Sequence, residues 1–331
     1  MNTERPACSV LVAAYNAERY LAQCLDSLTG QTLADIEIIV VDDGSADHTL
    51  QIAQRYAQAD ARVRCLALMA NHGQAYARNQ ALSLATGRYI CFLDADDWYA
   101  PDALAQAVSV FGRYPDTDCV LFEVVMWRSA GDWQLAKSEP FDCLTGREAF
   151  RKSLTWQIHG VYMVRADIHH RYPYDDTCRA YSDDNTTRIH YYIARHVRRC
   201  RGRYYYRQHA GSVTHQVSMR HFDYLRANES MRRQLIQLGV TDDVLSEYEN
   251  VRWLVLVDCY RFYYLHRRGM SPWTRRRALA EMRRVWRGIE VGRLYARNHY
   301  KLGYMPLRHS WCLFCRQEQV YFGLKRWLHR L

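Results

Sequence analysis

The sequence predicts an α/β fold with a doubly wound, mostly parallel sheet, followed by a helical extension. Three observations lead to this prediction. In the first hundred residues, short β-branched apolar runs alternate with amphipathic helical patterns, and turn residues close each run. Acidic and other polar residues follow the ends of these runs, where ligands bind to parallel sheets. Beyond about residue 220, long arginine-rich helical patterns replace the strand patterns.

The predicted elements follow one another in βαβα order. Strands are predicted over residues 8–15, 36–41, 63–68 and 89–93, and helices over 19–28, 49–58 and 74–85. Gly87 is predicted to cap the third helix at its C-terminus, and Asp47 to cap the second at its N-terminus. Further patterns predict a strand over 118–127 and helices over 146–155, 187–195, 222–238, 243–266 and 272–289.

An Asp-x-Asp pair, Asp94 and Asp96, follows directly on the fourth predicted strand. Where a strand leaves a sheet, such carboxylates point to one side and offer the hard oxygen ligands that Mg²⁺ and Mn²⁺ prefer. A metal with open positions at this point can hold a diphosphate. A short acidic run at a strand end can equally be a solvated turn, so the neighbouring motifs decide between the two interpretations.

Four segments resemble, in order and at ordinary spacing, the signatures of glycosyltransferase family 2, the inverting nucleotide-sugar transferases with a GT-A fold. These segments are Val10 to Asn16, Val41 to Ser45, Asn71 to Asn79 and Gly87 to Pro101. The resemblance covers about the first 110 residues and extends more loosely to Thr214. It implies a GT-A enzyme that transfers a sugar from a UDP-sugar to a hydroxyl group, with Mn²⁺ or Mg²⁺ as cofactor.

The resemblance assigns roles in the donor site to five residues. Tyr15 and Asp43 would hold the nucleotide base, and Asp94 would lie near the ribose. Asp96 would bind the metal that bridges the two phosphates, and Arg78 would lie near the diphosphate. Asp43 could instead serve only to form its turn, and Arg78 could lie on an exposed helix face.

The resemblance also implies a general base and an acceptor region. Family members carry Glu-Asp where this chain has Asp183 and Asp184, so Asp184 would take the proton from the acceptor hydroxyl. Either carboxylate could instead cap the helix that follows. Trp156 falls in the acceptor region, where it could stack on a sugar or pack in the core. Arg207 or His209 could reach the diphosphate or the metal, and His209 is the candidate further metal ligand.

The end of the resemblance near Thr214 and the change to arginine-rich helical patterns predict an approximate division of the chain near residue 220. Residues 1–220 are predicted to form the GT-A domain, with a nucleotide-sugar half over about 1–110 and an acceptor half over about 111–220. Residues 221–331 form the basic helical extension. Residues 1–110 carry 7 Lys or Arg against 13 Asp or Glu, a net charge of −6. Because the whole chain has a net charge of +10, residues 111–331 carry a net charge of +16.

The tail over residues 311–331 is basic, aromatic and amphipathic, which suits the surface of an anionic membrane. A helix packed on the main domain would show the same pattern. We expect neither a signal peptide nor a transmembrane helix, and the 11 scattered cysteines fit reduced thiols. The expected location is cytoplasmic, peripheral on the cytoplasmic face of the inner membrane. The expected acceptor is a glycan or a lipid-linked molecule in bacterial polysaccharide, capsule or lipopolysaccharide synthesis.

Two other interpretations stay open. The chain could be a non-catalytic subunit that binds a nucleotide sugar. Arginine-rich helices with interleaved Tyr and Trp could also bind nucleic acid. No nucleic-acid-binding motif is present and the N-terminal part is acidic, so we expect no nucleic-acid partner.

Overall fold

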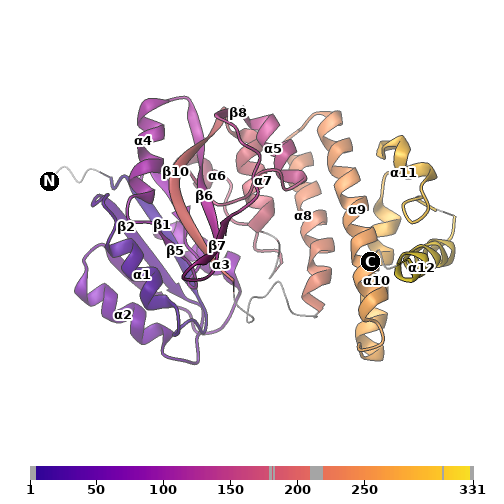
Figure 1. The fold of residues 1–331 in the computed structure, drawn as a ribbon, viewed down its shortest axis with the longest axis horizontal. Coiled ribbons are helices and arrows are strands. Elements are labelled where there is room, and N and C mark those ends of the chain that lie inside the picture. Colours follow the sequence, from indigo (N-terminus) through magenta and orange to yellow (C-terminus); the bar gives the residue numbers. More distant parts are fainter. Residues whose placement is uncertain (1–4, 179–180, 182, 209–218, 308, 329–331) are drawn as a thin grey trace. The chain divides into compact units, whose positions relative to one another are not determined.

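The computed structural model describes residues 5–178, 181, 183–208, 219–307 and 309–328 (Figure 1). The chain forms two compact units, residues 1–215 and 216–331. No helix within the described ranges is long and apolar enough to cross a bilayer.

The first unit is built on one mixed sheet, in which the described residues form ten strands. The strand order is β3-β2-β1-β4-β9-β6-β10-β5, with β7 paired to β6 and β8 paired to β10. The strands are β1 (Cys8–Ala14), β2 (Ile36–Asp42), β3 (Val63–Ala67), β4 (Tyr89–Phe92), β5 (Trp98–Tyr99), β6 (Thr117–Ser129), β7 (Asp132–Leu135), β8 (Cys143–Thr145), β9 (Tyr162–Arg165) and β10 (His196–Arg207).

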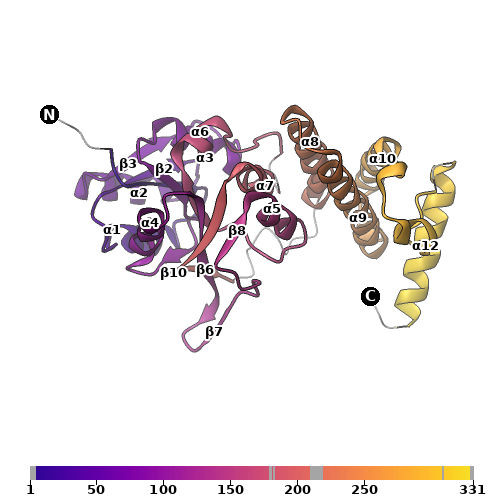
Figure 2. The ribbon, with the colours of Figure 1, turned by 90° about the horizontal axis from the view of Figure 1, so that it is seen from above.

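Helices cover both faces of this sheet (Figures 1 and 2). On β1, Val10 and Val12 pack into the core under α1, α2 and α4, and Leu11 packs into the core under α3, α5 and α7. Strands buried on both faces need continuous apolar runs, which explains the β-branched sequences of β1 and β2. The helices are α1 (Leu21–Thr29), α2 (Thr49–Ala59), α3 (Gln74–Leu84), α4 (Ala103–Arg113), α5 (Gly146–Leu154), α6 (Ala166–Arg171) and α7 (Asp183–Ile193).

The strands β3, β2, β1 and β4 are parallel, as the sequence predicts, and their carboxyl ends share one edge of the sheet. Beyond β4 the sheet is mixed, because β9 runs antiparallel to both β4 and β6. The predicted α/β class is therefore confirmed, but the sheet as a whole is mixed where a mostly parallel sheet was predicted, because parallel pairing is confined to β3, β2, β1 and β4 and to the pair β6 and β10.

Three local predictions differ from the structure. The helix predicted over residues 187–195 begins at Asp183, because acidic side chains are favourable in the first turn of a helix. Gly87 is not a helix cap, because α3 ends at Leu84. Its N–H instead donates to the Ser9 hydroxyl at 2.8 Å, and a Cβ there would lie 2.5 Å from the Ser9 nitrogen. Asp47 lies just before the capping position, and its carboxylate accepts from the backbone N–H of Thr49 at 3.0 Å.

The second unit is helical within the residues described. Its elements are η2 (Met219–Phe222), α8 (Asp223–Gln237), α9 (Asp242–His266), α10 (Pro272–Gly288), η3 (Val291–Arg293), α11 (Ala296–Tyr300) and α12 (Trp311–Trp327). Its core contains Trp253, Met282 and Phe314, contributed by α9, α10 and α12. The side chain of Ser271 and the proline that follows start α10, because a hydroxyl cap and a proline in the first turn both favour a helix start.

Candidate functional site

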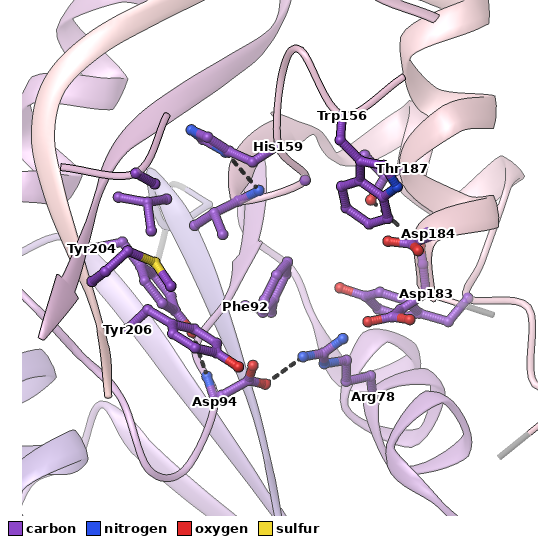
Figure 3. A pocket seen from close by; sticks show the side chains of 16 residues that line it. Arg78, Phe92, Asp94, Trp156, His159, Asp183, Asp184, Thr187, Tyr204 and Tyr206 are labelled. Atoms are coloured by element: carbon purple, nitrogen blue, oxygen red, sulfur yellow. Dashed lines mark hydrogen bonds and ion pairs between the residues drawn. The ribbon is translucent and has the colours of Figure 1, made fainter. Parts of the chain in front are cut away.

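A pocket of about 330 Å³ lies at the carboxyl end of β4 (Figure 3). It brings together five predicted site residues: Arg78, Asp94, Trp156, Asp183 and Asp184. The other lining residues are mostly apolar or aromatic: Phe92, Val124, Met126, Ala136, His159, Gly160, Val161, Tyr174, Thr187, Tyr204 and Tyr206.

Arg78 of α3 is buried in the wall of this pocket, with only 1% of its surface exposed, so it does not lie on an exposed helix face. Its Nη2 donates to Oδ1 of Asp94 at 2.5 Å, and its guanidinium lies over the rings of Phe92 and Tyr174, 4.1 and 5.3 Å from their centroids. Burial acts to lower the pKa of Arg78, but Asp94, Tyr174, Asp183 and Tyr204 together outweigh burial and raise that pKa. Arg78 therefore remains a cation.

The two other nitrogens of the Arg78 guanidinium, Nε and Nη1, are buried and have no hydrogen-bond partner among the described residues. Buried N–H groups normally have acceptors, and a guanidinium binds phosphate or carboxylate oxygens strongly. The position of Arg78 in the pocket wall therefore suits an anionic ligand.

Asp94 is held from two elements. Its Oδ1 also accepts from the Gln74 side chain at 2.8 Å, and its backbone N–H donates to the Tyr204 hydroxyl at 3.3 Å. Burial raises the pKa of Asp94, while Arg78 opposes that shift. One oxygen of the carboxylate is thus engaged with Arg78 and Gln74 at the pocket wall.

Asp97 follows the Asp-x-Asp pair and fastens its turn to β10. Its side chain is buried, with Oδ2 accepting from the Tyr204 hydroxyl at 2.6 Å and Oδ1 from the Arg207 backbone N–H at 2.7 Å. Burial, followed by the charges of Asp94 and Asp96, raises the pKa of Asp97 to about 8. Asp97 therefore positions the turn and does not line the pocket.

The guanidinium of Arg207 is enclosed by three aromatic rings, those of Tyr20, Trp98 and Trp127, at 4.9, 4.6 and 5.0 Å from their centroids. Its Nε donates to the backbone carbonyl of Asp96 at 2.8 Å and its Nη2 to the Gln23 side chain at 2.6 Å. Sequence reasoning missed this positioning role, because no local pattern shows which turn a distant arginine will contact. The other residue proposed beside it, His209, lies outside the described residues.

Tyr15 and Asp43 lie at the carboxyl ends of β1 and β2 and do not line the pocket. Tyr15 is half exposed. Asp43 is buried, and its two oxygens accept from the backbone N–H groups of His72 and Gly73 at 2.9 and 2.8 Å. Asp43 thus joins its own turn to the loop before α3, and each of its oxygens keeps a further lone pair for a ligand.

Asp183 and Asp184 occupy the first turn of α7, and Figure 3 shows both carboxylates on the same wall of the pocket. Burial raises the pKa of Asp184 to about 7, with Arg188 opposing this shift and Asp183 adding to it. A carboxyl with a pKa near neutrality can accept a proton efficiently at physiological pH.

Trp156 is exposed over 57% of its surface, so it is not a core residue. Its φ is +57°, a conformation that bulky residues rarely adopt and that often marks functional sites. The guanidinium of Arg188 lies 5.7 Å from its ring centroid. Trp156 thus presents an aromatic face at the pocket, next to the two carboxylates of α7.

The acidic residues of the turn fit a metal that the substrate helps to coordinate. Within the described ranges, no group of three or more His, Cys, Asp or Glu side chains is arranged to hold a metal. Mg²⁺ is commonly held by only one or two carboxylates, with substrate phosphates and water completing its shell. Asp96 and the neighbouring Asp94 supply carboxylates of this kind.

Comparisons with known proteins agree with this architecture. Residues 9–173, about half of the chain, match the family model described as Glycosyl transferase family 2. The chain is 44% identical to the putative glycosyltransferase EpsH of Bacillus subtilis over 118 residues, which are 36% of this chain and 33% of EpsH. It is 37% identical to the chondroitin synthase of Escherichia coli over 115 residues, 35% of this chain and 17% of that protein.

The matches to these curated relatives thus span a third of their length or less. The fold is similar to that of S. aureus TarS 1–349 in complex with UDP-GlcNAc, with a TM-score of 0.74 and 18% identity, covering 98% of this chain and 92% of that one. The predicted family and fold are confirmed, and the chain belongs to glycosyltransferase family 2.

Proposed function

We propose that this protein is an inverting glycosyltransferase that moves a sugar from a UDP-sugar to a hydroxyl group of a glycan or lipid-linked acceptor. The proposal rests on two residues that line a single pocket, Arg78 and Asp184. Arg78 is buried and has N–H groups without a partner among the described residues, so it suits the binding of a diphosphate. The pKa of the Asp184 carboxyl is raised to about 7, which suits a general base.

Asp184 takes the proton from the acceptor hydroxyl as the hydroxyl attacks the anomeric carbon. The UDP leaving group departs on the opposite face of the sugar, so the anomeric configuration is inverted, as in enzymes that place base and leaving group on opposite faces. The N–H groups of Arg78 receive phosphate oxygens. Asp183 and the exposed ring of Trp156 orient the acceptor, because aromatic faces bind sugar rings well.

The nucleotide is bound at the carboxyl ends of β1, β2 and β4 in this proposal. Tyr15 and Asp43 contact the base, Asp94 lies near the ribose, and Asp96 binds the cation. A bound Mn²⁺ or Mg²⁺ would neutralise charge on the diphosphate. The role of His209 as a further metal ligand remains a prediction.

The names of the relatives support the wider setting of this proposal. TarS 1–349 is known in complex with UDP-GlcNAc, and a matching relative is a chondroitin synthase. We therefore propose a role in bacterial polysaccharide, capsule or lipopolysaccharide synthesis. Residues 1–220 are the catalytic domain in this proposal, and residues 221–331 are an extension that holds the enzyme on the cytoplasmic face of the membrane.

Hydrolysis of nucleotide sugars tests this function. Purified protein is incubated with a panel of UDP-, GDP- and CMP-sugars, with and without Mn²⁺ or Mg²⁺, and the released nucleotide is measured. We expect slow, metal-dependent release of UDP that is lost in Asp96→Ala. The exposed Asp102, which accepts a hydrogen bond from Gln106, provides the control variant Asp102→Ala.

The same experiment separates the alternatives. Calorimetric binding of a UDP-sugar without release of UDP, also in the presence of candidate acceptors, would favour the non-catalytic subunit. Release of GDP or CMP in place of UDP would overturn the donor assignment while leaving the pocket chemistry in place.

A further inference from the structure

The helix α10 presents an exposed row of arginines, which we call the arginine face of α10. It consists of Arg276, Arg277, Arg283, Arg284 and Arg287, with the exposed Trp273 at its N-terminal end. Arg283 follows Arg276 by seven residues, which is two helical turns, and the other positions are adjacent to these two or three or four residues from them, so all share one side of the helix. The opposite side is buried in the core of the second unit through Ala278, Met282, Val285 and Trp286.

Most of the charge on this face is not neutralised. Arg284 pairs with Glu281 at 3.2 Å, and Arg277 lies over the ring of Trp273, 5.2 Å from its centroid. No acidic side chain in the described part of the chain pairs with Arg276, Arg283 or Arg287. Like charges three or four residues apart on a helix repel each other, so this face favours an anionic partner.

The whole second unit strengthens this attraction. Residues 216–331 contain 22 Lys or Arg and 10 Asp or Glu, a net charge of +12 with histidine neutral. Charge alone would allow several kinds of anion to bind this surface.

The helix α12 carries an exposed row of apolar residues, which we call the apolar stripe of α12 and which distinguishes between these anionic partners. It consists of Leu313, Val320, Leu324 and Trp327, and 76% of the Trp327 surface is exposed. Their spacing of seven, four and three residues places them on one side of the helix. The same helix carries Arg316, Lys325 and Arg326. A soluble polyanion offers nothing to apolar side chains, whereas a bilayer interface accepts leucine and tryptophan together with arginine.

We propose that the arginine face of α10 and the apolar stripe of α12 bind the surface of an anionic lipid bilayer. The arginines contact lipid phosphates, and Trp273 and Trp327 enter the headgroup region. This identifies the surface behind the peripheral location proposed above. It stands whether or not the chain transfers a sugar, because none of these residues lines the pocket.

Sedimentation of the full chain with vesicles tests the electrostatic half of the proposal. We expect binding to vesicles of phosphatidylcholine with 30% phosphatidylglycerol, and weak binding to pure phosphatidylcholine. Each arginine near an anionic surface contributes on the order of fivefold to partitioning, so R276Q/R283Q/R287Q should bind roughly 100-fold more weakly. The matched control, R55Q/R113Q/R171Q, removes the same charge from exposed positions in the first unit and should bind like the wild type.

Quenching of tryptophan fluorescence by brominated lipid tests the apolar half. We expect quenching in the wild type that falls in W273F/W327F, with circular dichroism confirming that every variant is folded. Three results would overturn the proposal: equal binding to neutral and anionic vesicles, equal losses in the control variant, or tight binding to inorganic polyphosphate without any quenching by lipid. A stable dimer in sedimentation velocity that shields Trp327 would overturn the role of the apolar stripe.

Discussion

Arg207 and Asp97 are joined across the first unit by a hydrogen bond of 2.7 Å from the backbone N–H of Arg207 to Oδ1 of Asp97. The guanidinium of the same arginine donates to the backbone carbonyl of Asp96 at 2.8 Å. One residue of β10 therefore fixes two consecutive residues of the acidic turn. Because Asp96 is the proposed metal ligand, its position depends on a strand that follows about 110 residues later in the chain.

Tyr204→Phe tests whether this attachment matters for the metal. The change removes the hydroxyl that donates to Asp97 and accepts from the Asp94 backbone. A buried acceptor left without its donor costs about 1–3 kcal/mol. We expect a lower melting temperature and at least ~10-fold weaker Mn²⁺ binding in the presence of UDP, measured by calorimetry. Tyr205→Phe is the control, because Tyr205 stacks on Trp98 from the opposite side of the strand. Unchanged Mn²⁺ affinity in Tyr204→Phe would show that the attachment serves stability alone.

The raised pKa of Asp184 should make the rate of sugar transfer depend on pH. A general base works only when it is deprotonated, and the pKa of Asp184 is raised to about 7. We therefore expect kcat/KM to rise with pH up to about 7 and then level off. Asp184→Asn should lose about 10²–10⁴-fold in turnover while still binding UDP. Asp183→Asn, on the same helical turn, should lose less. A flat profile between pH 5 and 8 would remove Asp184 from this role.

Arg78→Lys tests the anion-binding wall of the pocket. Lysine keeps the charge but lacks the planar guanidinium group, whose several N–H donors can contact Asp94 and a phosphate at the same time. We expect UDP to bind about tenfold or more weakly in isothermal calorimetry, whereas Arg55→Lys, an exposed change on α2, should leave binding unchanged. Full UDP affinity in Arg78→Lys would show that the unused N–H groups of Arg78 do not meet the diphosphate.

Gly87→Ala tests the close approach of the β4 entry to β1. The added Cβ would lie 2.5 Å from the Ser9 nitrogen and 2.8 Å from the Cys8 carbonyl carbon, and both are backbone atoms that cannot rotate away. We expect a loss of about 1–3 kcal/mol in the free energy of unfolding. Gly112→Ala in α4 meets nothing within 4 Å and should stabilise by about 0.5–1 kcal/mol. Denaturant titration of both variants compares them directly, and equal stabilities would contradict the close contact.

Local sequence patterns predict the first four strands well, because each is a short apolar run closed by turn residues. They do not predict β5 and β8, which are short and pair with the distant strand β10, or β7, which is short and forms a hairpin with the end of β6. The antiparallel pairing of β9 with both β4 and β6 is likewise a long-range feature.

The same distinction applies to the site. The resemblance to the family motifs predicts Asp94 and Asp184 as site residues, and both line one pocket in the structure. The burial of Arg78 depends on Phe92 and Tyr174, and the enclosure of Arg207 depends on rings from three separate parts of the chain. Such packing is set by tertiary structure and leaves no periodic signal in the sequence.

The buried side chain of Glu318 should make the stability of the second unit depend on pH. Its side chain is fully buried in α12, where Oε1 accepts from the Gln317 side chain at 3.1 Å and Oε2 has no partner among the described residues. Burial raises the pKa of Glu318 to about 8 from the ordinary value of 4.5. The folded state thus holds the proton more tightly than the unfolded state does. The resulting stability is present below pH 4.5 and is lost as the pH rises through about 8.

Glu318→Gln keeps the shape of this side chain and removes its titration. We expect the melting temperature of the variant, relative to that of the wild type, to rise steadily between pH 5 and pH 8.5. Since one pKa unit corresponds to about 1.4 kcal/mol, the change should reach ~3 °C or more in scanning calorimetry. Asp243→Asn, at an exposed carboxylate of α9, removes the same charge and should show no such trend. A constant difference between Glu318→Gln and wild type across this range would mean that Glu318 is already ionised in the folded protein, with a cation or water supplying the partner that Oε2 lacks.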